Sequence, residues 1–307
     1  MNRILVIILF FFIVAQDSFA QQAPQFSQNM FNKLANNPGY AGTREAISTT
    51  LLHRTQWMGF EGAPQTLNLS VDAPVRLIKG GLGLNIVQDN IAEHSNLGLQ
   101  ASYSFASKLG QGQLGLGISL GMFQAALGND WRQADEGDPV INTSSVTGSS
   151  ADLGAGIYYN TQDVYIGLST AHISEPKIEL SGSGSFNLKR HYFMIAGYYY
   201  SLNPNLSLNP SIYLKSDGAT SQLDINSNVI YNNKIWGGLS FRHAEPVFKP
   251  ELVLLTGMHI TEDLKFGLAY DIVLSEIGKN SIEFMLGYSF KINKEPNISR
   301  HKNPRFL

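Results

Sequence analysis

The chain has 307 residues, and its 22 Lys and Arg side chains are nearly balanced by 24 Asp and Glu, which gives a formal net charge of −2. The basic residues are scattered, so nothing indicates a nucleic-acid partner, and the lack of cysteine excludes disulfides, zinc–thiolate sites and a cysteine nucleophile. Charged residues make up only 15% of the chain, against roughly 25% in ordinary soluble proteins. Because Gly, Tyr and Phe are abundant and no apolar run is long enough for a spanning helix, the composition favours a transmembrane β-barrel.

The first twenty residues have the three parts of a secretory signal peptide. Arg3 supplies the positive start, residues 4–15 form an apolar core, and Ser18-Phe19-Ala20 is a cleavage site of the small–x–small kind. The apolar core is shorter than the roughly 20 residues that a spanning helix needs. We therefore expect residues 1–20 to be removed on export into the envelope of a Gram-negative cell.

Residues 24–42 are unlike the rest of the chain. Phe26, Met30 and Phe31 are interleaved with Gln, Ser and Asn, and residues 36–42 (NNPGYAG) are dense in turn residues. Asn and Gly tolerate the backbone angles of tight turns, and the proline disfavours a helical conformation at the residue before it. An Asn-rich linker is the alternative interpretation, but linkers rarely carry so many aromatic side chains.

This stretch and the one that follows it resemble the opening of the PorP/SprF family of type IX secretion system membrane proteins of Bacteroidetes. One departure is Gly39, where we expect Ala in the family, and it should matter little to a turn. The resemblance at the level of motifs covers about forty residues. It is carried by residues 24–28 (PQFSQ), 30–32 (MFN), 37–42 (NPGYAG), 56–57 (QW) and 59–64 (GFEGAP).

From residue 46 onward, large apolar residues alternate with small or polar ones. Residues 281–290 (SIEFMLGYSF) and 113–121 (QLGLGISLG) show this clearly. Strands of a membrane barrel have this pattern, because one face meets lipid and the other meets the lumen. We predict an all-β fold, an outer-membrane β-barrel of about 14 antiparallel strands, near residues 46–55, 65–73, 80–90, 95–106, 112–123, 151–160, 163–170, 188–200, 205–215, 222–232, 234–242, 250–260, 263–274 and 280–292.

The connections between these strands alternate in length. With a periplasmic N-terminus, the odd-numbered connections face outward and include the two longest, residues 124–150 and 171–187, whereas the even-numbered ones are mostly tight. We therefore expect a signal peptide (1–20), a periplasmic N-terminal segment that is a candidate plug or lid (21–45), the barrel (46–292) and a periplasmic tail (293–307).

The sequence contains one pattern typical of a catalytic site, but its surroundings do not fit that site, and it contains no metal-ligand spacing. Residues 117–121 match G-x-S-x-G, but that motif needs a sharp turn and a helix after the serine, and here Ser119 continues a strand. The histidines are scattered singly, without paired ligand spacing. We expect no catalytic, cofactor-binding or metal-binding residues, no cofactor and no enzymatic activity.

Partner binding is expected on connections, where binding residues are disproportionately found. The longest outer connection contains Trp131, Arg132, Asp135 and Glu136. Trp and Arg are enriched at binding hot spots, so these four residues are the first candidates for contact with a partner.

The aromatic residues of the N-terminal segment are the second candidates. Phe26, Phe31 and Tyr40 would otherwise be exposed to water, and burying one such side chain contributes roughly 1.5–3 kcal/mol. They should therefore dock, either in the barrel's own lumen or on a partner protein.

The family resemblance implies a function that the residues alone do not. It implies an outer-membrane component of the type IX secretion and gliding motility system, which delivers or anchors secreted, adhesin-like cargo at the cell surface. The implied partners are the type IX C-terminal domain of the cargo, other secretion-system subunits and the lipid bilayer. The alternative is an outer-membrane channel for a small solute, because the many small inward residues leave room in the lumen.

Overall fold

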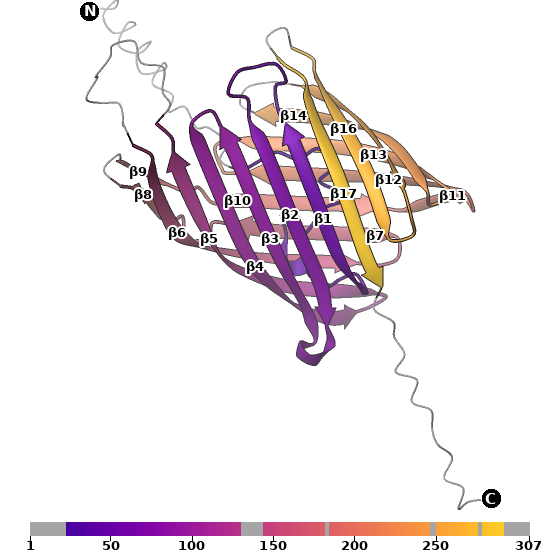
Figure 1. Ribbon diagram of the computed structural model, residues 1–307. Coiled ribbons are helices and arrows are strands. Elements are labelled where there is room, and N and C mark those ends of the chain that lie inside the picture. Colours follow the sequence, from indigo (N-terminus) through magenta and orange to yellow (C-terminus); the bar gives the residue numbers. More distant parts are fainter. Residues whose placement is uncertain (1–22, 130–143, 182–183, 246–249, 276–277, 292–307) are drawn as a thin grey trace, which may run out of the picture.

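The computed structural model describes residues 23–129, 144–181, 184–245, 250–275 and 278–291. Fourteen strands form one antiparallel barrel (Figure 1), if β10 and β11 are counted as a single strand interrupted at Tyr199. The ring closes because β1 pairs with both β2 and β17, and β10 pairs with both β7 and β12. The predicted fold class is confirmed.

The strands follow each other around the ring in chain order. The first half contains β1 (Ala46–Thr55), β2 (Gln65–Val75), β3 (Gly80–Ile91), β4 (His94–Leu109), β5 (Gly112–Leu127), β6 (Val146–Asn160) and β7 (Val164–Ala171). The second half contains β10 (His191–Tyr198), β11 (Tyr200–Asn203), β12 (Leu206–Ser216), β13 (Ser221–Tyr231), β14 (Ile235–Glu245), β15 (Glu251–His259), β16 (Leu264–Val273) and β17 (Ser281–Lys291). The described residues also contain two single-turn 3-10 helices, η1 (Pro38–Tyr40) and η2 (Arg76–Ile78).

The predicted alternation of faces along the strands is present. In β5, Ile118 and Leu120 are 64% and 62% exposed on the outside, whereas Gly117 and Ser119, which alternate with them, are buried on the lumen side. An apolar outer face and a small or polar inner face suit a barrel that meets lipid outside. Among the residues that the structure describes, no helix is long and apolar enough to cross a membrane.

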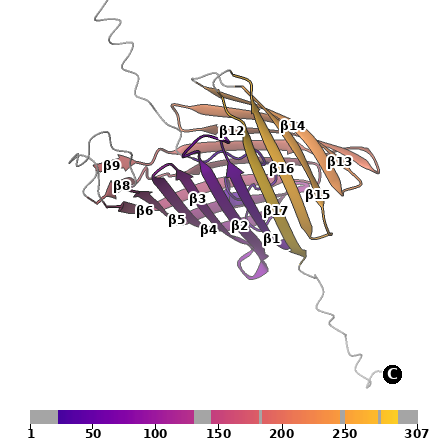
Figure 2. The same cartoon turned by 45° about the horizontal axis from the view of Figure 1, so that its top comes forward.

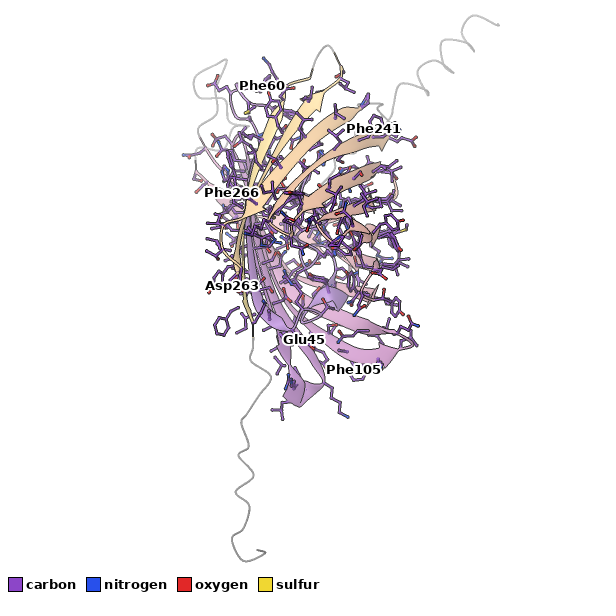
Figure 3. The ribbon with its side chains drawn as sticks, turned by 90° about the vertical axis from the view of Figure 1, so that its right-hand side faces the viewer. Glu45, Phe60, Phe105, Phe241, Asp263 and Phe266 are labelled. Carbon is purple, nitrogen blue, oxygen red and sulfur yellow. The ribbon has the colours of Figure 1, made fainter. Side chains whose placement is uncertain are left out.

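The two ends of the barrel differ in the length of their connections. At the short-connection end, where β1 begins and β17 ends, neighbouring strands are joined by two to four residues. At the long-connection end, all the longer connections are found, up to the 19 residues between β7 and β10. Figure 3 places Phe60 at the long-connection end, and Asp263 and Glu45 toward the opposite end.

The barrel wall is extended at the long-connection end. Strands β5 and β6 run beyond their predicted limits, to Leu127 and from Val146, and pair with each other along this extension. A separate hairpin, β8 (Lys177–Leu180) and β9 (Gly184–Asn187), lies beside them (Figure 2). Ala125, Ile178 and Leu188 form a small buried apolar cluster that fastens the hairpin to the wall.

The orientation of the barrel in the membrane can be tested with single cysteines, since the native chain has none. Cysteines in place of Ala219 and Lys279, at the long-connection end, should react with a membrane-impermeant thiol reagent on intact cells. Cysteines in place of Gln111 and Glu262, at the short-connection end, should react only after the outer membrane is opened. This is expected because the longer connections of outer-membrane barrels face outward. The reverse labelling pattern would show that the barrel is oriented the other way.

Candidate functional site

Residues 23–45, which we call the lumen segment, lie inside the barrel. The segment starts at the long-connection end, where the ammonium of Lys215 donates to the carbonyl oxygens of Ala23 and Pro24 at 3.0 and 3.2 Å. It reaches the short-connection end at Gly42, whose amide donates to Asp72, and then continues into β1. The candidate functional site is therefore the lumen together with the segment that crosses it.

Charged side chains from six different strands, five of them buried, meet in the long-connection half of the lumen. Arg242 forms ion pairs with Asp224 at 2.9 Å and with Asp271 at 2.9 Å, and Arg54 pairs with Asp271 at 2.7 Å. Leaving one of these groups unpaired would be costly, because a buried charge without its partner destabilises a protein by about 3–5 kcal/mol. We call this set the charged cluster: Arg54, Asp224, Arg242, Glu251, Asp271 and Glu283.

The lumen segment completes the hydrogen bonding of the charged cluster. The hydroxyl of Ser27 donates to Asp271 at 2.7 Å and accepts from Arg54 at 2.9 Å. The side-chain amide of Asn29 donates to the carboxylate of Asp224 at 2.9 Å. Because carboxylates and guanidinium groups need several partners once they are removed from water, the polar residues of the segment and the charges of the wall depend on each other.

In the short-connection half, the segment is held by close backbone packing and by the hydrogen bonds of one asparagine side chain. Asn37 caps η1, accepting a hydrogen bond from the amide of Gly39 at 2.8 Å and donating to the carbonyl oxygen of Ile157 in β6 at 3.0 Å. The turn lies against strand glycines that we call the glycine wall: Gly81, Gly115, Gly117 and Gly156. Added Cβ atoms at these positions would overlap the segment, those at Gly115, Gly117 and Gly156 within residues 37–39. Gly42 has φ +70°, a conformation that side chains disfavour, and packs on Gly81.

Lys33 occupies a cage of tyrosine rings in the middle of the lumen. Its ammonium lies 3.5 Å from the ring centroid of Tyr165 and 5.7 and 5.9 Å from those of Tyr40 and Tyr158. Cation–π contacts of this kind gain strength where water is excluded.

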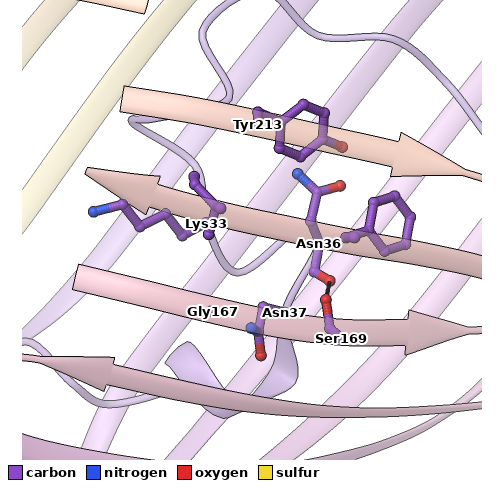
Figure 4. A pocket seen from close by; sticks show the side chains of 8 residues that line it. Lys33, Asn36, Asn37, Gly167, Ser169 and Tyr213 are labelled. Atoms are coloured by element: carbon purple, nitrogen blue, oxygen red, sulfur yellow. Dashed lines mark hydrogen bonds between the residues drawn. The ribbon is translucent and has the colours of Figure 1, made fainter. Parts of the chain in front are cut away.

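Beside this cage the segment also bonds to the wall through its main chain. Figure 4 shows a small pocket of about 10 Å³ between the segment and the strands β7, β10 and β12. Here the hydroxyl of Ser169 donates to the carbonyl oxygen of Asn36 at 2.6 Å. Tyr213 of β12 and Lys33 of the segment also line this pocket.

A second, larger cavity of about 100 Å³ lies toward the long-connection end, between Ala23 and Phe26 of the segment and the strands β3 to β7. Phe123 and Phe193 contribute apolar surface to it. Most of its polar lining consists of amides and carboxylates, from Asn85, Asp89, Asn96, Gln100 and Asp152. Among the residues that the structure describes, no three His, Asp or Glu side chains are placed to hold a metal ion.

The structure describes only one of the two predicted groups of partner-binding residues. Trp131, Arg132, Asp135 and Glu136 lie outside the described residues. The predicted contact residues of the N-terminal segment lie in the lumen. Their side chains pack on the inner wall, Phe26 with Leu52, Trp236 and Met285, Phe31 at 5.2 Å from the ring of Trp236, and Tyr40 at 5.0 Å from the ring of Tyr158.

The sequence analysis did not identify the charged cluster, because its members are far apart in the chain. A usable signal was present in the alternation of faces. Arg54, Asp224 and Arg242 fall on the side of their strands that carries small or polar residues, so each charge points into the lumen. The register of β16 and β17 pairs Asp271 with Ser281 and Ala269 with Glu283, which makes Asp271 and Glu283 diagonal neighbours on the lumen face.

A model of a protein family, described as "Type IX secretion system membrane protein PorP/SprF", matches residues 18–289 of the chain. Among solved structures, the CymD monoaromatic hydrocarbon channel superposes with a TM-score of 0.52 at 11% identity, over 90% of this chain and 95% of the channel. The Ralstonia pickettii toluene transporter TbuX gives 0.50 at 12% identity, over 84% of this chain and 92% of the transporter. At these identities the likeness concerns the fold alone. No curated protein matches the chain.

The fit between segment and glycine wall predicts the effect of a larger side chain. Valine in place of Gly117 should overlap Pro38 and Gly39. This overlap should destabilise the bound position of the segment in the lumen by about 1–3 kcal/mol. The fraction of molecules whose segment has left the lumen should then rise roughly ten- to hundredfold. A cysteine in place of the buried Ala41 reports this as faster reaction with a thiol reagent in the purified barrel. Gly98→Val is the matched control, since a Cβ there has its nearest neighbour at 3.9 Å. Equal protection in both variants would contradict the fit.

Proposed function

The chain belongs to the PorP/SprF family of type IX secretion system membrane proteins, and from this premise we propose that it holds secreted cargo at the cell surface. As a member of this family it is an outer-membrane barrel with a role in type IX secretion. The proposal adds that the barrel delivers or anchors an adhesin-like cargo protein. The cargo would be held through its C-terminal domain.

The observation that carries this proposal is the occupied lumen. The lumen segment contacts the inner wall from Lys215 at the long-connection end to Asp72 near the short-connection end. Its burial, its ion-paired surroundings and the glycine wall indicate that it belongs to the folded state. A barrel built around its own chain is suited to anchoring a partner. A channel for a small solute, the alternative, would need a path past this segment.

Contact with the cargo is then expected at the long-connection end. The extension of β5 and β6, with the hairpin β8–β9 fastened to it, gives this end a raised base held by strand pairing and a buried apolar cluster. The connection that leaves this base, residues 128–145, contains the four predicted contact residues Trp131, Arg132, Asp135 and Glu136. Such support of a loop rich in hot-spot residue types favours binding, because less ordering is needed on contact. Other secretion-system subunits would meet the periplasmic end.

Replacing residues 128–145 with a short Gly-Ser turn tests the proposal. The barrel should still assemble at normal abundance, because no strand pairing and no lumen contact of the described residues is touched. The partner cargo should be released into the medium or degraded. Unrelated type IX substrates should continue to reach the surface, and both groups can be measured by quantitative proteomics of cells and medium.

Two variants sharpen this experiment. Replacing residues 217–220, a connection several strands away at the same end, should leave cargo display unchanged. The double substitution Trp131→Ala and Arg132→Ala should reproduce much of the loss caused by the loop replacement. Unchanged display of every substrate without residues 128–145 would overturn the assignment of this loop.

A further inference from the structure

The first six described residues of the lumen segment are held by contacts to their main chain as well as to their side chains. Glu283 accepts hydrogen bonds from the amides of Ser27 at 2.7 Å and Gln28 at 2.9 Å, one with each carboxylate oxygen. Arg242 donates to the carbonyl oxygen of Phe26 at 3.2 Å. Together with the two bonds from Lys215 to Ala23 and Pro24, three wall side chains make five contacts with peptide groups. Contacts of this kind recognise an extended polypeptide rather than one particular sequence.

Two side chains add a limited selectivity to these main-chain contacts. Phe26 is buried among Leu52, Trp236 and Met285, so the site favours a large apolar residue there. The next position is Ser27, which is fully buried and whose hydroxyl contacts the charged cluster. A larger side chain at that position would displace Arg54 or Asp271. The wall thus selects an aromatic residue followed by a small residue with a hydroxyl group.

The two halves of the segment are held in different ways. Residues 37–42 fit closely against the glycine wall. A side chain in place of a wall glycine, or in place of Gly39 or Gly42 in the segment, would overlap the opposite surface. Within residues 23–28, only the end of the Gln28 side chain approaches a wall glycine, Gly267, in this way. The cavity of about 100 Å³ lies directly beside Ala23, Pro24 and Phe26. The first half is therefore the part that an incoming chain can replace, provided that this chain makes the same hydrogen bonds to the charged cluster. The second half stays fixed.

We infer that the long-connection end of the lumen is a binding site for an extended polypeptide, and that residues 23–28 are its resident occupant. The ligand is a peptide segment with an aromatic residue followed by Ser or Thr, bound by Lys215, Arg242 and Glu283 through its main chain. This inference rests on the proposed function in one respect, since it takes the natural ligand to be a segment of the secreted cargo. The amides and carboxylates of the cavity supply further hydrogen-bonding groups for such a segment.

Exchange requires that the incoming segment competes with an occupant on the same chain. A tethered occupant acts at an effective concentration on the order of millimolar. A free peptide would compete poorly, but a cargo already held by the outer connections presents its own segment at a similar effective concentration. The lumen site would then strengthen a contact that begins on the loops.

The test uses a purified barrel in which Ala20 is joined to Asn32, so that the fixed half remains. A fluorescent peptide with the sequence of residues 23–31 should bind saturably, as measured by anisotropy. The same peptide with methylated amides at Ser27 and Gln28 cannot donate to Glu283 and should bind at least tenfold more weakly. The substitution Phe26→Ala in the peptide should weaken binding by a similar factor. Absence of saturable binding, or equal binding of the methylated peptide, would overturn the inference.

A second measurement uses the full chain and does not depend on folding of the shortened barrel. In the variant Glu283→Ala, a cysteine in place of Gln25 should react with a thiol reagent at least tenfold faster than in the parent. A cysteine in place of Ala41, in the fixed half, should remain protected in both. Equal protection of Gln25→Cys with and without Glu283, or loss of protection at both positions, would contradict an exchangeable first half. These readouts need no cargo, so the replacement of residues 128–145 can fail or succeed independently of them.

Discussion

The size of the lumen is the constraint on which the rest of this structure depends. A ring of fourteen strands encloses more space than its inward side chains fill, and the interior of such a barrel must hold either water or protein. Here several inward positions near the short-connection end are the glycines of the glycine wall, which widen the space further. The turn at residues 37–42 fits into that space with backbone against backbone, so the wall and the segment are two halves of one core.

The same reasoning explains the polar half of the lumen. A barrel interior tolerates charged residues only where they are paired or hydrogen-bonded. Arg54 and Arg242 neutralise carboxylates from four strands, and Ser27, Gln28 and Asn29 supply hydrogen-bond partners that the wall lacks. The segment is thus apolar and glycine-rich where the wall is tight, and polar where the wall is charged. The lumen segment must both pack against the glycine wall and bond to the charged cluster. Its sequence therefore lacks the regular alternation of the strands.

Much of the fold could be predicted from the sequence. A strand that faces lipid on one side and a lumen on the other has large apolar residues that alternate with small or polar ones, and this pattern can be recognised within about ten residues. The prediction for residues 46–55 coincides with β1, and the predicted faces of β17 are those observed. The eighth strand was predicted as one piece, residues 188–200, but begins at His191 and is interrupted at Tyr199. The prediction for residues 171–187 as a plain loop missed the hairpin β8–β9, which forms through contacts with β5 and β6.

The lumen site was predictable only in part, because its partners are brought together by closure of the ring. The aromatic content of residues 24–42 indicates docking, and composition alone cannot choose between the lumen and another protein. The choice depends on Glu283, Arg242 and Lys215, which lie more than 180 residues away in the chain. No local sequence pattern links these three residues to Ser27. They come close to the segment only because strand pairing closes the ring around it.

Single-channel conductance in planar bilayers tests the central claim, that the chain fills its own barrel, most directly. The intact protein should show little or no stepwise current. A barrel in which Ala20 is joined to Thr43 keeps every strand, and it should conduct in large, stable steps, because its lumen is then filled with water. Steps of the same size from both proteins would show that ions pass the lumen segment freely, and would contradict the account.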